Sequence, residues 1–108
     1  WDLLVLTPGG AATVLTRGVV PGRRGPAWTP DSRSIVFVHD DDDRFDPILR
    51  VSVLAPERPV AVDTGTVGNQ DVSVVRRPDG RTWIAFAAQG LATDAVRDFH
   101  RIYAQPLH

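Results

Sequence analysis

Short apolar runs separated by turn-forming residues are the dominant pattern along this chain of 108 residues. The runs are rich in Val, Ile, Leu and Phe and are bounded by Gly, Pro, Asp and Asn, which is typical of strands joined by turns. A helical period is almost missing, although 91–99, LATDAVRDF, is compatible with a helical turn. We therefore predict an all-β fold with strands at 2–6, 12–16, 26–29, 34–38, 48–54, 59–63, 72–75, 82–87 and 100–105.

A repeat with a period of 48 residues runs through the chain. Pro30-Asp31 and Pro78-Asp79 stand at this spacing, and each precedes a short apolar run. We interpret both as hairpin turns, because proline fixes φ, Asp bonds back to the backbone, and Gly or Ser tolerates a tight corner. Segment 1–18 also aligns with 49–65, which predicts a structural unit of four short strands. The aligned pairs are Leu3 with Val51, Val5 with Val53, Leu6 with Leu54, Pro8 with Pro56, Val14 with Val62 and Thr16 with Thr64.

Residues 28–37, WTPDSRSIVF, resemble the Trp-Ser-Pro-Asp-Gly and Ile-Ala-Phe pattern that opens the blades of TolB-like β-propellers. DLLVL at 2–6 and Leu15-Thr16 are similar to the later half of such a blade. The sequence departs from the pattern at Ser32, which replaces the turn glycine, and at Arg76, which stands where the first copy has Trp28. Several large aromatic residues lie in or beside the predicted strands, so we expect them to pack between blades. They are Trp1, Trp28, Trp83, Phe37 and Phe86.

The resemblance implies a β-propeller fragment of four-stranded antiparallel blades, about two blades plus part of a third. The outer strands of one blade would span 1–16, a complete blade 17–64, and most of the next blade 65–108. A ring needs about four or more blades, so either further blades lie outside this sequence or copies of the chain assemble. The start of the sequence inside a predicted strand favours the first explanation.

Composition excludes several classes of function. The net charge of −1 gives no electrostatic case for nucleic acid or for an anionic membrane surface. Cysteine is absent, which excludes disulfides and thiolate metal sites. The longest apolar runs are far too short for a membrane span. All twelve basic residues are arginine, and this arginine and alanine usage suggests a GC-rich bacterial genome.

Candidate binding residues lie in the long polar loops. In a propeller blade the loop between the second and third strands and the loop between blades share one end. Here these loops are 17–25, 39–47, 65–71 and 89–100, whereas the turns PDSRS, APER and PDGRT at the opposite end are short. Binding is commonly carried by loops on a rigid scaffold. The predicted partner-binding residues are Arg23, Arg24, Asp42, Arg44, Asn69, Arg97 and His100.

Motifs for catalysis, metals and cofactors are missing from the sequence. Asp40 to Asp43, with Asp46, offer the oxygens that calcium prefers, but the loop lacks the turn glycine and terminal glutamate of a calcium-binding loop. A solvated acidic loop is the interpretation we favour. The histidines show no metal-ligand spacing, and the sequence has no Gly-x-Ser-x-Gly elbow. We therefore predict no catalytic residue, no metal and no cofactor in this chain.

The resemblance implies a non-catalytic, extracytoplasmic or periplasmic scaffold that recognises a protein or peptide partner and contacts other blades of the same propeller. Blades of similar sequence also precede the hydrolase domain of the prolyl-oligopeptidase family, where they gate substrate entry. The alternative is therefore a substrate-gating propeller segment of an α/β-hydrolase-type peptidase, with its catalytic residues outside this chain. A Gly-x-Ser-x-Gly elbow in a longer chain would select the alternative, and a secretion leader with further blades would select the scaffold. Fold analogy alone supports both.

Overall fold

The computed structural model describes residues 2–6, 8–17, 26–39, 46–94 and 100–108. These residues form strands and turns without a helix, so the prediction of an all-β fold is confirmed. Every strand pairing is antiparallel. The strands are β1 (Asp2–Leu6), β2 (Ala12–Arg17), β3 (Ala27–Trp28), β4 (Ser34–Val38), β5 (Ile48–Ser52), β6 (Ala55–Ala61), β7 (Thr66–Val67), β8 (Gln70–Arg76), β9 (Thr82–Ala88), β10 (Gly90–Leu91) and β11 (Arg101–Pro106).

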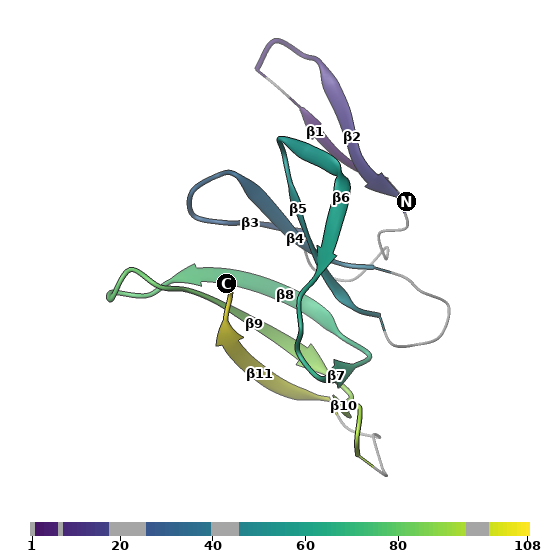
Figure 1. The fold of residues 1–108 in the computed structure, drawn as a ribbon, viewed down its shortest axis with the longest axis vertical. Helices are drawn as coiled ribbons and strands as arrows, with labels where there is room; N and C mark the ends of the chain where they lie inside the picture. Colours follow the sequence, from purple (N-terminus) through teal and green to yellow (C-terminus); the bar gives the residue numbers. More distant parts are fainter. Residues whose placement is uncertain (1, 7, 18–25, 40–45, 95–99) are drawn as a thin grey trace.

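Three sheets are stacked in chain order (Figure 1). The first is the β1–β2 hairpin, the second has the order β3–β4–β5–β6, and the third has the order β11–β9–β8. A short β7–β10 ladder forms a fourth, two-stranded sheet. The radius of gyration is 14.1 Å, against about 13 Å for a compact domain of this length. The excess follows from adding sheets along one direction, which gives extents of 49 × 36 × 22 Å.

The middle sheet is buried on both of its faces. Successive side chains of a strand point to opposite faces, and all five residues of β4 are buried. Phe37 and Ile35 pack with Leu3 and Leu15 of the hairpin. Val36 and Val38 point to the other face and pack against β8 and β9. Phe37 and Phe86 are 0% and 2% exposed, which confirms that both belong to a core between sheets.

The two Pro-Asp segments form turns of closely similar geometry. Asp31 Oδ1 accepts a hydrogen bond from Arg33 N at 3.0 Å, and Asp79 Oδ1 accepts one from Arg81 N at 3.0 Å. The residue after each aspartate lies in the left-handed region, with φ of 59° at Ser32 and 85° at Gly80. The interpretation of these segments as structural turns is confirmed.

Strand boundaries differ from the prediction around the third turn. The turn between β5 and β6 is formed by Val53 and Leu54, and the APER segment at 55–58 lies within β6. The period of 48 residues therefore pairs Val5 and Leu6, which lie in or at the end of β1, with residues of a turn. The short strands β7 and β10 were not predicted. Of the proposed helical turn at 91–99, residue 91 ends β10, 92–94 form a turn, and 95–99 lie outside the described residues.

We expected Trp28 to be buried between sheets, but it is not. Its side chain is 49% exposed, although it pairs with the buried Ile35. The hairpin that packs on this face has two strands; its β2 lies against β6, at the edge of the middle sheet opposite β3, and its side chains reach as far as β4. No described element therefore covers Trp28. Trp83 is half-buried, with the Arg77 guanidinium 4.7 Å from its ring centroid, and Trp1 lies outside the described residues.

Candidate functional site

The seven predicted partner-binding residues are placed unevenly by the structure. Asn69 and His100 are described, and His100 is exposed immediately before β11. The other five lie outside the described residues: Arg23, Arg24, Asp42, Arg44 and Arg97. Asp40 to Asp43 of the acidic loop also fall outside them. Within the described ranges, no group of three or more His, Asp or Glu side chains is arranged to hold a metal ion.

Asn69 is a buried structural residue and not an exposed contact. Its side chain is 1% exposed. The Asn69 amide nitrogen donates to the main-chain oxygen of Asp46 at 3.0 Å, and its oxygen accepts a hydrogen bond from the Thr66 hydroxyl at 2.5 Å. The bond from Asn69 to Asp46 thereby connects the segment before β8 to the end of the loop that follows β4. The side chain is therefore not exposed as we expected, and a role of Asn69 in partner binding stays a prediction.

Three of the four long loops, 39–47, 65–71 and 89–100, are joined through their described residues at one end of the stack, which we call the long-loop end. The β7–β10 ladder joins the second of these loops to the third, and Asn69 joins the second to the first. The main-chain bonds Gln89 N to Val67 O at 3.0 Å and Ala92 N to Gly65 O at 2.8 Å strengthen this junction. In Figure 1 this end lies opposite the turns of β3–β4 and β8–β9.

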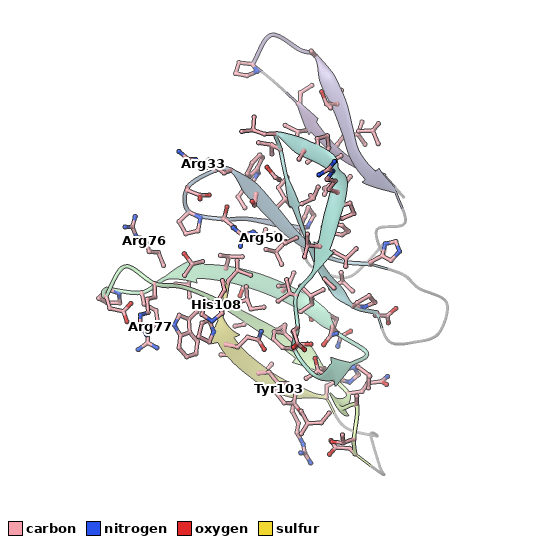
Figure 2. The ribbon with its side chains drawn as sticks, in the orientation of Figure 1. Arg33, Arg50, Arg76, Arg77, Tyr103 and His108 are labelled. Carbon is pink, nitrogen blue, oxygen red and sulfur yellow. The ribbon has the colours of Figure 1, made fainter. Side chains whose placement is uncertain are left out.

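The second candidate site lies between those two turns. A cavity of about 280 Å³ separates the middle sheet from the third sheet there. We call it the Pro-Asp cleft, and its polar lining residues are Thr29, Asp31, Arg50, Arg76, Thr82 and His108. Figure 2 shows Arg76 projecting from the end of β8 toward the β3–β4 turn, with Arg50 and His108 farther to the right in this view. A smaller hollow of about 210 Å³ adjoins it, also lined by Arg50 and His108.

The acidic group of the Pro-Asp cleft is held in its charged form. Asp31 Oδ1 accepts hydrogen bonds from the Thr29 hydroxyl at 2.6 Å and from Arg33 N at 3.0 Å. The bond from Thr29, then the bond from Arg33 N and the charges of Arg33 and Arg50, hold the pKa of Asp31 below its ordinary value of 3.8. Asp31 therefore stays a carboxylate at neutral pH.

The basic groups of the cleft come from opposing sheets. Arg50 is half-buried in β5 and donates through Nη1 to the main-chain oxygen of His108 at 2.7 Å. Arg76 ends β8 and lies opposite Thr82 in the β8–β9 register. Neither Arg76 nor the Thr82 side chain has a hydrogen bond or ion pair within the described part of the chain. Two guanidinium groups thus accompany one carboxylate that is already bonded within its own turn.

The wall of the cleft is formed by the segment after β11. Leu107 N donates to Thr82 O of the third sheet at 2.9 Å, and the main-chain oxygen of His108 accepts the bond from Arg50 of the middle sheet at 2.7 Å. The Leu107 side chain also packs against the core between the middle and third sheets. This segment is therefore fixed to both sheets.

The Pro-Asp cleft was not predicted from the sequence, because its lining residues are far apart in the chain. The one signal that pointed to it is Arg50, a charged residue inside the apolar run ILRVSVL. A charge at the centre of a strand between two sheets needs polar surroundings, and here the cleft provides them.

Comparisons of the chain with protein-family models, curated proteins and solved structures found no match. Among the described residues no helix is long and apolar enough to cross a membrane.

Proposed function

We propose that the chain is part of a non-catalytic recognition scaffold of the β-propeller type, similar to TolB-like propellers. The observation that carries this proposal is the middle sheet, a four-stranded antiparallel unit that is buried between two other sheets. The repeated Pro-Asp turns and the blade-like pattern at 28–37 support it. By the same resemblance, we place the protein in an extracytoplasmic compartment of a bacterium.

The outer faces of the stack are consistent with contacts to further blades. Ile102 and Val75 of the third sheet are 79% and 54% exposed, and Leu4 and Leu6 of the hairpin are 51% and 70% exposed. Isolated pieces of a repeat array expose surface that neighbouring repeats normally cover. In the proposed protein, further sheets of the same propeller cover these residues.

The proposed recognition surface is the long-loop end, because its loops are joined to one another and supported by the stacked sheets. A protein or peptide partner would contact the arginines predicted on these loops, Arg44 and Arg97. Rigid support of this kind lowers the entropic cost of ordering a binding loop.

The test uses two matched sets of arginine variants. A partner obtained by affinity capture with the full chain is titrated against Arg44→Ala and Arg97→Ala from the long-loop end, and against Arg33→Ala and Arg81→Ala from the Pro-Asp turns. We expect the first pair to weaken binding about tenfold or more and the second pair to leave it unchanged, with unfolding midpoints unaltered in all four. Weakening by the second pair alone would show that the partner binds at the end of the stack that carries the Pro-Asp turns. Equal binding by all four variants would refute recognition through either set of loops.

A further inference from the structure

We propose that the Pro-Asp cleft is a binding site for a small oxyanion, of the size of phosphate or of a short carboxylate. The inference rests on the geometry of the cleft and does not depend on the proposed propeller or its partner. The cleft lies at the end of the stack opposite the long-loop end.

Three groups in the cleft offer hydrogen-bond donors to an anion. A guanidinium has five N–H donors, and Arg50 uses Nη1 for its bond to His108 O. Arg76 has no hydrogen bond or ion pair to any described residue, and the Thr82 hydroxyl directly across the β8–β9 ladder has none either. Planar guanidinium groups are well suited to carboxylate and phosphate, because they bind both through paired, charge-assisted hydrogen bonds.

The charges favour an anion over a cation. Among the described residues, Asp31 is the one acidic side chain that lines the cleft, and its Oδ1 is already bonded to the Thr29 hydroxyl and to Arg33 N. Arg50 and Arg76 carry two positive charges and Asp31 carries one negative charge, so these three side chains have a net charge of +1. An anion is repelled by Asp31, so we place it on the side of Arg76 and Thr82, within reach of Arg50.

The size of the cleft restricts the ligand. Its volume of about 280 Å³ is slightly below the range of about 300–1,000 Å³ that is usual for drug-sized ligands. The fixed wall at Leu107 closes one side, since Leu107 N is bonded to Thr82 O. The half-buried position of Arg50 strengthens its attraction for an anion, because charges interact more strongly away from bulk water. A single phosphate or carboxylate group fits these conditions.

The experiment follows main-chain amide shifts of the full chain by NMR while inorganic phosphate or malonate is added at constant ionic strength. We expect saturable shifts centred on Arg76, Gly80, Thr82 and Leu107. Arg76→Gln should weaken this binding at least tenfold, whereas Arg33→Gln, a control at the neighbouring turn that does not line the cleft, should leave it unchanged. Saturation by phosphate alone would assign the site to phosphate groups, and saturation by malonate alone would assign it to carboxylates.

Arg50→Gln gives a second variant that should lose binding, but Arg50 also holds His108. If this variant does not fold, Thr82→Val, which removes one hydroxyl, takes its place and should weaken binding several-fold. Shifts that rise linearly with anion concentration and spread over the charged surface would overturn the proposal. Equal weakening by Arg33→Gln and Arg76→Gln would also overturn it. Either failure leaves the partner test at the long-loop end unaffected, because that test measures the binding of a protein partner through residues that do not line the cleft.

Discussion

At the scale of single residues, the two Pro-Asp turns differ at the position after the aspartate. Both positions are left-handed, with φ of 59° at Ser32 and 85° at Gly80. A side chain in this region costs free energy that glycine avoids. We expect Ser32→Gly to raise the free energy of unfolding by about 0.5–1 kcal/mol and Gly80→Ser to lower it by about 1 kcal/mol.

Urea unfolding of both variants checks this expectation. A Cβ at Gly80 would meet no atom within 4 Å, so the second change measures the backbone conformation without a steric clash. If Ser32→Gly destabilises the protein, the serine contributes an interaction that outweighs its strained backbone.

Asn69 gives the second prediction at this scale. Because its side chain is 1% exposed and bonded on both sides, Asn69→Ala leaves the Asp46 carbonyl and the Thr66 hydroxyl without these partners. We expect a loss of about 1–3 kcal/mol in the free energy of unfolding, the range for an unsatisfied buried group. His100→Ala is the exposed control and should change it by less than about 0.5 kcal/mol. Equal, small effects of the two substitutions in thermal unfolding would argue against the structural role of Asn69.

At the scale of strands, the sequence predicted most elements because Pro, Gly and Asp bound their apolar runs. The predictions for 2–6 and 34–38 coincide with β1 and β4. The turn at Val53 and Leu54 was missed because neither residue carries turn chemistry, and β-branched or apolar residues usually indicate a strand. The two-residue strands β7 and β10 depend on a contact between distant loops, which no local pattern encodes.

The burial of aromatic residues was also predictable only where a neighbouring sheet is present. Phe37 is 0% exposed between the hairpin and the middle sheet, whereas Trp28 on the same sheet is 49% exposed. We expect Phe37→Ala to cost about 3–5 kcal/mol and Trp28→Ala about 1–2 kcal/mol, since about half of the tryptophan side chain remains in water. Chemical denaturation of the two variants measures the difference. A larger loss for Trp28→Ala would show that this tryptophan is covered in solution, by another copy or by residues outside the described ranges.

At the scale of the whole molecule, stacking creates features that a linear sequence does not show. The Pro-Asp cleft combines Asp31, Arg50, Arg76 and His108, which no spacing rule connects. Their meeting depends on how the middle sheet lies on the third sheet, and this is set by side-chain packing between them. The repeat indicated that sheets would follow one another, but it did not give the surface between their turns.

The same stacking predicts an uneven distribution of stability. The middle sheet belongs to both cores, whereas the β1–β2 hairpin pairs with no third strand among the described residues and is held by one core. Regions with fewer buried contacts open locally below the free energy of global unfolding. We therefore expect amides of β1 and β2 to exchange with deuterium at least about tenfold faster than those of β4 and β9.

Two core variants separate local opening from global unfolding. Leu15 belongs to the core under the hairpin, and Ile84 belongs to the core between the middle and third sheets. Leu15→Ala should speed exchange in β1 and β2 while β9 stays protected, because β9 packs in the other core. Ile84→Ala should speed exchange in β4, β8 and β9 together, since the middle and third sheets share that core. Hydrogen exchange read by mass spectrometry resolves these segments, and equal acceleration of all of them by Leu15→Ala would mean that the three sheets unfold as a single unit.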